Sequence, residues 1–475
     1  MIADPRLCIS IFHVDISEAH VTRNRKHIPL QNNKLIRGLG LAEATALNMI
    51  DMVGIGPFVV VPLVIGAMNG PQSIVAWIVG ALLALVDGFL WAELGAAMPE
   101  AGGSYVFLRE IYGPKTWGKL FSFLFIWQTM FQAPLVVASG SIGFSQYFTY
   151  LLPLDSMQQK MISGLLVIVL VLLLYRKITT VGKISLLLWI GVIGTIIWLI
   201  IGGATHFNPR LAFDYPEGAW DLSFLFFAGV GQATVKTVYT YLGYYNVCHL
   251  GGEIRNPQKN IPRSIFISIF GIAILYLAMQ LSILGVVPWR EGMNSQFIVS
   301  TFVERIYGTG AGTVATILIL WIAFASLFAV LLGYSRIPYA AANDGAFFSI
   351  FARVHPTKHF PHVSLLVLGG AAFVFSLLFK LKDVISAILA MRILVQFIGQ
   401  AVGVIHLRKK WSSERLPFKM WLFPIPALLA ILIWIGLFLS TGWQFALAGV
   451  GMMVLGVFVY LIRSKMKNDW PFSVT

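Results

Sequence analysis

Long apolar runs separated by short polar segments follow one another along almost the whole chain. A helix needs about 20 mostly apolar residues to cross roughly 30 Å of hydrocarbon, and runs of about this length predict twelve transmembrane helices. The predicted spans are residues 39–68, 72–98, 118–149, 160–175, 183–204, 222–250, 264–287, 312–340, 363–380, 384–406, 422–440 and 443–463. The pattern therefore predicts an all-α polytopic membrane protein.

The first apolar run is interrupted at its centre by residues 54–57, Gly-Ile-Gly-Pro. Glycine costs roughly 1 kcal/mol and proline roughly 3 kcal/mol in a helix interior, so we expect the helix to break here. Non-helical backbone at membrane depth persists only where protein buries it or a polar cavity hydrates it. We interpret the stretch as a candidate binding site, the alternative being a glycine kink for close helix packing.

A second interruption lies in span 6, where Gly243 sits among the polar residues of segment 239–246. It comes five spans after the first, and an odd number of spans inverts the second half relative to the first. Many transporters are inverted repeats with broken helices at the midplane. The spacing predicts a five-plus-five inverted repeat of residues 39–204 and 222–406, broken helices 1 and 6, and two trailing helices in residues 422–463.

Composition agrees with a membrane protein, because 58% of the 475 residues are hydrophobic and only 11% are charged. The net charge of +14 comes from Lys and Arg residues between apolar spans, so it indicates topology and not nucleic-acid binding. Alternating the loops places 26 of the 34 Lys and Arg residues on one side. The positive-inside rule then makes residues 1–38 and 464–475 cytoplasmic tails of a plasma-membrane protein, and no cleaved signal peptide is expected.

A broken helix exposes N–H groups that suit an anion and carbonyls that suit a cation. At the first break, Ile55 and Gly56 offer N–H groups to a carboxylate, whereas Pro57 has none. At the second break, the segment 241–243 offers carbonyls to an ammonium group, through Tyr241, Leu242 and Gly243. An amino acid carries both charges. Aromatic residues near the breaks, Tyr244 among them, are candidates to line the pocket or to pack the core.

Charged residues inside spans are functional candidates, because burying a charge in lipid costs at least a few kcal/mol. Asp51 precedes Gly54 by three residues, so its carboxylate is expected either to meet a substrate cation or proton or to serve a structural role. Lys236 lies on the outer side of the second break and either attracts a substrate carboxylate or snorkels to the interface. We expect Arg392 and Asp87 to belong to structural ion pairs.

The loop carboxylates admit simpler interpretations. Glu93 and Glu100 lie near the inner end of span 2, where a gate contact and a plain loop carboxylate are equally consistent with the sequence. Glu253 is expected to form a loop cluster with Arg255 and Arg263. The sequence has no metal-ligand cluster, no phosphate-binding loop and no nucleophile elbow, so we predict neither a cofactor, nor a metal, nor an enzyme.

Four stretches resemble the amino acid, polyamine and organocation transporter superfamily. They are residues 54–58 (Gly-Ile-Gly-Pro-Phe), 91–105 (Trp-Ala-Glu-Leu-Gly-Ala-Ala-Met-Pro-Glu-Ala-Gly-Gly-Ser-Tyr), 252–263 (Gly-Glu-Ile-Arg-Asn-Pro-Gln-Lys-Asn-Ile-Pro-Arg) and 335–345 (Ser-Arg-Ile-Pro-Tyr-Ala-Ala-Ala-Asn-Asp-Gly). They occur in the family's order and cover nearly the whole chain. The resemblance implies twelve helices, a five-plus-five inverted repeat and alternating access.

The resemblance also implies a small-molecule substrate, an amino acid or a polyamine, moved by proton symport or exchange. Carried over residue by residue, it assigns Gly54, Ile55 and Gly56 to the carboxylate and the segment 241–243 to the amino group. Ile55 and Pro57 make this loop poorer in donors than the family pattern. Span 8 has Ser326 without a second hydroxyl, which weighs against sodium, and span 5 has no central lysine for proton coupling.

We therefore predict a secondary active transporter of neutral L-amino acids. A transporter of polyamines or cationic amino acids is the alternative. A membrane sensor or scaffold that transports nothing is a more distant one, because a scaffold gains little from weakened spans. Substrate identity, coupling ion and oligomeric state stay open at the level of sequence.

Overall fold

The computed structural model describes residues 35–379, 388 and 391–472. Most of the predicted tail of residues 1–38, part of the predicted span 384–406 and the end of the predicted tail 464–475 therefore lie outside the described residues. Within the described ranges the chain is helical, with two isolated β-bridges and no strand longer than these. The predicted all-α fold class is confirmed.

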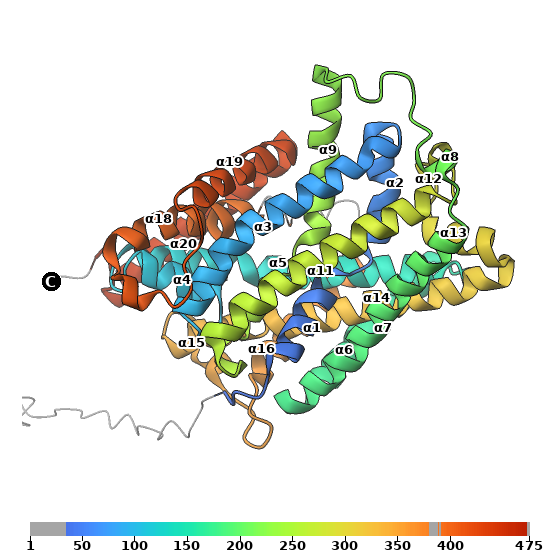
Figure 1. Cartoon of the computed structure of the whole chain (residues 1–475). Helices are drawn as coiled ribbons and strands as arrows, with labels where there is room; N and C mark the ends of the chain where they lie inside the picture. The colour runs from blue at the N-terminus through green and yellow to red at the C-terminus, as the bar shows by residue number, and fades with distance from the viewer. Residues whose placement is uncertain (1–34, 380–387, 389–390, 473–475) are drawn as a thin grey trace, which may run out of the picture. The chain divides into compact units, whose positions relative to one another are not determined.

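The helices follow one another as shown in Figure 1. In the first half they are α1 (Leu41–Met52), α2 (Gly56–Met68), η1 (Pro71–Ser73), α3 (Ile74–Ala97), α4 (Ser104–Ile111), α5 (Trp117–Phe148), α6 (Ser156–Leu174), α7 (Ile178–Thr205), α8 (Pro209–Ala212), α9 (Phe224–Tyr241) and α10 (Asn246–His249). In the second half they are η2 (Gly251–Glu253), α11 (Pro257–Leu284), α12 (Trp289–Gly292), α13 (Ile298–Tyr307), α14 (Thr309–Tyr334), α15 (Arg336–Asn343), η3 (Ser349–Ala352), α16 (His362–Leu378), η4 (Ile393–Ile398), α18 (Gly399–Lys410), η5 (Ser413–Arg415), α19 (Ile425–Ser440) and α20 (Trp443–Lys467).

Seven helices in the described part of the chain are long and apolar enough to cross a membrane, and the bent pair α1–α2 makes an eighth span. The seven contain α3, α5, α6, α7, α11, α14 and α20. Two further apolar helices, α16 and α19, are shorter. The chain is thus a polytopic membrane protein, while the count of twelve spans stays a prediction.

Local sequence explains where several helices begin and end. Asp155 accepts hydrogen bonds from the backbone N–H groups of Met157 and Gln158, both at 2.8 Å, and so caps α6. Ser223 accepts from Phe226 N–H at 3.3 Å and caps α9. Proline at N1 or N2, where a missing N–H costs little, begins α2, α11 and α19.

Both predicted breaks are present. The axis bends by 47° between α1, which ends at Met52, and α2, which begins at Gly56. The second break separates α9, which ends at Tyr241, from α10, which begins at Asn246. α2 packs along α9 and α1 packs against α10, so the two broken helices run in opposite directions, as an inverted repeat requires (Figure 1).

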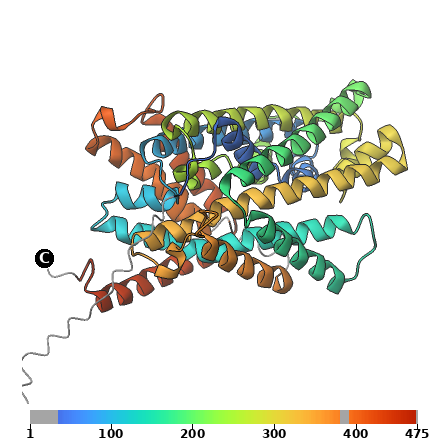
Figure 2. The ribbon, with the colours of Figure 1, turned by 90° about the horizontal axis from the view of Figure 1, so that it is seen from below.

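Helices differ in how much of their surface the protein covers. The most apolar stretches of α5 and α14 are 61% and 72% buried, and these two helices pack on each other beside α1. The corresponding stretch of α20 is only 17% buried, and α20 lies at the edge of the described helices along α5 (Figure 2). Because the apolar side chains of α20 face outward, lipid is their solvent.

Two fully buried carboxylates, Glu253 and Glu93, form ion pairs with distant arginines. Glu253 accepts from Arg336 at 2.8 and 2.9 Å, and both side chains are at most 2% exposed. The expectation that Glu253 pairs with Arg255 and Arg263 was therefore wrong, since its partner lies 83 positions away on α15. Glu93 pairs with Arg408 at 2.6–2.7 Å and is fully buried, so it is no plain loop carboxylate.

Candidate functional site

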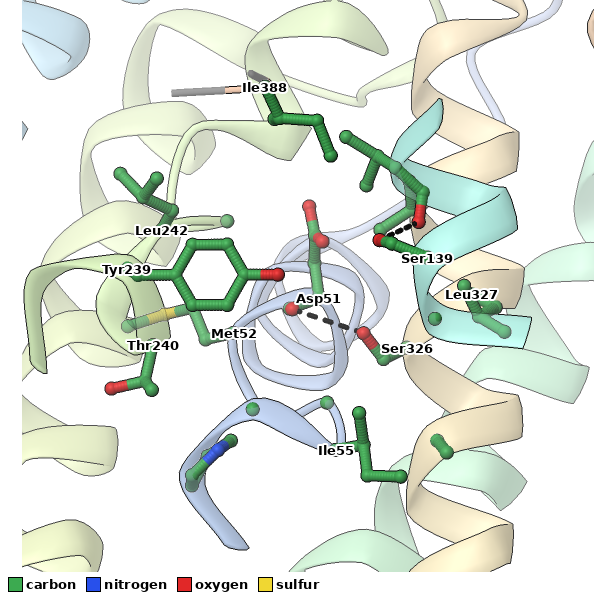
Figure 3. Close-up of a pocket in the computed structure, with 18 of the residues that line it drawn as sticks. Asp51, Met52, Ile55, Ser139, Tyr239, Thr240, Leu242, Ser326, Leu327 and Ile388 are labelled. Carbon is green, nitrogen blue, oxygen red and sulfur yellow. Dashed lines mark hydrogen bonds between the residues drawn. The ribbon is translucent and has the colours of Figure 1, made fainter. Parts of the chain in front are cut away.

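A cavity of about 100 Å³ lies where the two helix breaks meet. Figure 3 shows the Asp51 side chain extending from the end of α1 into this space, beside the ring of Tyr239, whose hydroxyl points toward it. α5 contributes Ser139 and α14 contributes Ser326. The cavity is thus formed by the two broken helices and two long central helices, together with Ile388 and Arg392.

The first break presents free backbone donors to the cavity. Gly54, Ile55 and Gly56 all line it, and the N–H groups of Gly54 and Ile55 have no hydrogen-bond partner among the described residues. Ser326 Oγ donates to the Asp51 carbonyl at 3.3 Å and holds the end of α1 against α14. A Cβ atom on Gly54 would lie 2.8 Å from Ser326 Oγ, so a larger residue at this position would displace the hydroxyl from the Asp51 carbonyl. The free donors point to an anion-binding position.

The second break presents free carbonyls. The carbonyls of Tyr241 and Leu242 accept no hydrogen bond from any described residue, whereas the Gly243 carbonyl accepts from Asn246 N–H at 2.9 Å. Gly243 has a φ of +126°, and a Cβ atom there would lie 2.8 Å from Met52 N and 2.9 Å from Asp51 C. Glycine is therefore required for the two breaks to touch. Unpaired carbonyls at a helix end suit a cation.

Two buried side chains join the breaks. Tyr276 of α11 donates its hydroxyl to the Met52 carbonyl at 2.8 Å and lies 3.3 Å from the Thr240 carbonyl. Asn48 of α1 accepts from Val247 N–H at 2.9 Å through its side-chain oxygen. These contacts satisfy backbone groups that the interruptions release, and lipid has no groups to satisfy them.

Arg392 brings a positive charge to the cavity opposite the carboxylate of Asp51. The two groups interact electrostatically, but no ion pair within 4 Å joins them or joins either to another described residue. The Arg392 guanidinium donates to the Tyr245 hydroxyl and to Gln396 Oε1, the latter at 3.0 Å. It also lies 5.9 Å from the centre of the Tyr334 ring. The expected structural ion pair of Arg392 is therefore absent from the described residues, and Arg392 faces the site.

Asp87, the other residue expected in an ion pair, is held by neutral donors. Its carboxylate accepts from Tyr244 at 2.6 Å and from Trp91 and Trp434 at 2.9 Å each. Three hydrogen bonds to the charged form compensate for its burial. Tyr244 therefore points away from the cavity at the breaks, toward α3.

Of the other predicted site residues, Gly54, Ile55, Gly56, Leu242 and Gly243 line the cavity. The Tyr241 side chain does not, because it packs on Trp77 and Tyr276 and donates to the Trp77 carbonyl at 3.3 Å. Lys236 is half-buried in α9 and is not among the lining residues. In the described parts of the chain no group of three or more His, Cys, Asp or Glu residues is placed to hold a metal ion.

Access to the cavity is unequal on its two sides. Ile55 also lines a larger space of about 680 Å³ that follows α2 toward the ends of α5 and α12. On the opposite side, Trp91 stacks on Tyr245 with ring centroids 4.5 Å apart, and His249 stacks on Tyr334 at 5.8 Å. These four side chains are buried. The cavity thus opens along α2 and is closed toward α10.

Residues 39–463 match the family model described as amino acid permease. The chain is 25% identical to the serine/threonine exchanger SteT of Bacillus subtilis (strain 168) over 84% of this chain and 90% of that protein. It is also 25% identical to the branched-chain amino acid permease BcaP of the same strain, over 91% of this chain and 94% of that protein. The human cystine/glutamate transporter is 26% identical over 84% of this chain and 80% of its own length.

Proposed function

The chain belongs to the amino acid permease family, and from this premise we propose that it moves neutral L-amino acids across a membrane by alternating access. One observation carries the proposal. The residues that line one small cavity supply the free N–H groups of Gly54 and Ile55, the free carbonyl of Leu242, one carboxylate and one guanidinium. A zwitterion has a carboxylate and an ammonium group, which together complement these four kinds of polar group.

In the proposed complex the substrate carboxylate accepts from the N–H groups of Gly54 and Ile55 at the start of α2. The substrate ammonium group donates to the carbonyl of Leu242, directly after the end of α9. Each contact joins an ionised group to the helix end of opposite partial charge. The free backbone groups of the described structure support these positions.

The size of the cavity supports a small substrate. A water molecule needs roughly 10–15 Å³ of such space, so the site holds about seven to ten water-sized groups. Amino acids from alanine to leucine have a similar number of non-hydrogen atoms. Larger substrates would require the side toward the 680 Å³ space to widen.

The two opposite charges of the cavity support a zwitterionic substrate. A unit charge roughly 6–8 Å away contributes about 2–3 kcal/mol at an effective dielectric constant near 20. Arg392 alone therefore disfavours a substrate with net positive charge by about 30- to 100-fold, while Asp51 favours it by a similar factor, so the two contributions cancel for a single net charge. A zwitterion gains from both charges, because its carboxylate can face Arg392 while its ammonium group faces Asp51.

For coupling, we propose that Asp51 carries a proton or that the protein exchanges one amino acid for another. The Asp51 carboxylate faces the cavity without a hydrogen bond from any described residue, so it is available to a proton or a substrate cation. The positive-inside pattern supports cytoplasmic termini in a plasma membrane, with the space along α2 facing outward. The serine/threonine and branched-chain relatives, by their names, support neutral substrates and include an exchanger.

Uptake into proteoliposomes tests the proposal. The purified full chain is reconstituted and given labelled alanine, serine, leucine, lysine, aspartate and putrescine, with and without a pH gradient or internal substrate. We expect saturable uptake of one or more neutral amino acids. No flux of any amine or amino acid would refute the transporter assignment, and uptake of putrescine alone would refute the neutral class.

A matched pair of substitutions ties the flux to the breaks. Gly243→Ala forces a side chain into the contact with α1, whereas Gly370→Ala places one in open space on α16, where nothing lies within 4 Å. We expect uptake to be lost in the first variant and retained in the second. Equal uptake by both variants would exclude the meeting of the breaks as the site.

A further inference from the structure

A second cavity, of about 740 Å³, lies on the outside of the helices, far in sequence from the breaks. One wall is α5, with Phe123, Trp127 and Phe131. The second wall is the segment that follows α15, with Phe347 and Phe348. The third is the last part of α20. We refer to this space as the α5–α20 groove.

The groove is open to the surroundings of the protein. Phe131 is 38% exposed and Phe348 is 70% exposed, and α20 is the least buried of the membrane-spanning helices described. Trp127 is anchored by donating its Nε1–H to the Met452 carbonyl of α20 at 3.2 Å. An apolar, aromatic groove open to the membrane holds hydrocarbon in preference to water.

Two cations lie at one end of the groove. Arg463 and Lys467 are four residues apart on α20, so they share a helix face, and both line the groove. Arg463 donates to the Gly345 carbonyl at 3.0 Å, and Lys467 has no ion pair with a described residue. Of the nearby carboxylates, Asp344 pairs with Arg109, and Asp469 pairs with Lys119 while it also interacts electrostatically with Arg463. Lys467 therefore keeps its charge available to a ligand, and Arg463 adds to it in part.

This end of α20 lies at the level of the lipid headgroups. The helix has 25 residues, which is about 37 Å and longer than the hydrocarbon core, so its last turn reaches the interface. Trp117 and Trp470 lie there with ring centroids 5.1 Å apart, and Trp117 is 57% exposed. Tryptophan is enriched at this depth.

We propose that the α5–α20 groove binds an anionic phospholipid, with an acyl chain along the aromatic walls and the phosphate between Arg463 and Lys467. The apolar length and the paired cations match the two parts of such a lipid. Zwitterionic lipids fit the apolar part equally well but gain less from the two cations. The site is separate from the cavity at the helix breaks and does not depend on the transported substrate.

The test compares phosphatidylglycerol with phosphatidylcholine of identical acyl chains. Each lipid is added to the purified full chain in mild detergent. Native mass spectrometry counts bound lipid, and tryptophan fluorescence follows the thermal midpoint. We expect phosphatidylglycerol to be retained more and to raise the midpoint further. Arg463→Gln with Lys467→Gln should remove this preference, and Lys467→Gln alone should lower phosphatidylglycerol affinity by about fivefold.

Lys465→Gln is the matched control, because Lys465 lies in the same last turn, is exposed and does not line the groove. We expect it to retain the preference. Val459→Trp fills the groove without changing charge, and should reduce retention of both lipids. Equal binding of the two lipids, or equal losses in Lys465→Gln and Lys467→Gln, would overturn the proposal. So would a lipid-free dimer that Val459→Trp dissociates, because the groove would then be a subunit interface.

Discussion

Replacing Tyr276 by phenylalanine removes one hydroxyl that contacts both broken helices. The hydroxyl donates to the Met52 carbonyl and lies within hydrogen-bond distance of the Thr240 carbonyl. Tyr276 is fully buried, so no water replaces the lost donor. The ring itself keeps its contacts with Trp77 and Tyr241, at centroid distances of 5.2 and 5.3 Å. The change is therefore confined to the polar contact.

Leaving buried carbonyls without a donor costs about 1–3 kcal/mol. If this free energy destabilises the arrangement of the two breaks that binds substrate, the substrate affinity weakens by about 5- to 150-fold. We expect the KM for amino acid uptake by Tyr276→Phe proteoliposomes to rise within this range, with a lower thermal midpoint in detergent. The maximal rate should fall less, because the lining side chains are unchanged.

Tyr241→Phe is the control for this experiment. It makes the same chemical change in the same aromatic cluster, but the Tyr241 hydroxyl contacts the Trp77 carbonyl of α3 and no group at the breaks. We expect a similar effect on stability and little effect on KM. Equal rises in KM for the two variants, or an unchanged KM for Tyr276→Phe, would refute the reasoning.

Three other substitutions, and a fourth as a control, test the charges. Asp51→Asn should abolish the dependence of uptake on a pH gradient, and unchanged dependence would remove Asp51 from coupling. Arg392→Gln should improve competition by lysine and putrescine relative to leucine by about 30- to 100-fold, measured as inhibition constants; unaltered selectivity would contradict its role. Glu253→Gln should cost about 3–5 kcal/mol in an unfolding titration, because Arg336 stays buried without its carboxylate. Glu100→Gln, whose carboxylate is 63% exposed, should change stability by less than about 1 kcal/mol, and an equal loss would exclude burial as the cause.

The positions of the breaks were predictable because their cause is local. Glycine and proline within an apolar run weaken a helix wherever it packs, and the structure interrupts the first helix between Met52 and Gly56. Gly243 has a positive φ in the second break. Counting spans between the two sites also predicted that they run in opposite directions.

The partners of the charged residues were not predictable, because they come from distant parts of the chain. Arg392 lies more than 300 residues after Asp51, yet both line one cavity. Its only signal in the sequence is a lone arginine within an apolar span. For a related reason, the sequence left open whether Tyr244 lines the pocket or packs the core. Side chains in a broken segment follow no helical periodicity, so only the packing against Asp87 fixes its direction.

The charges of Asp51 and Arg392 raise the free energy of enclosing the cavity when no substrate is bound. Neither has an ion-pair partner in the described structure, and burying an unpaired charge costs several kcal/mol. A bound zwitterion lowers this cost, and a proton on Asp51 removes part of it. Under the proposed alternating-access mechanism we therefore expect the return of the empty carrier to be the slow step, so that amino acid on the far side accelerates flux from the near side. We therefore expect exchange of one amino acid for another to be faster than net uptake.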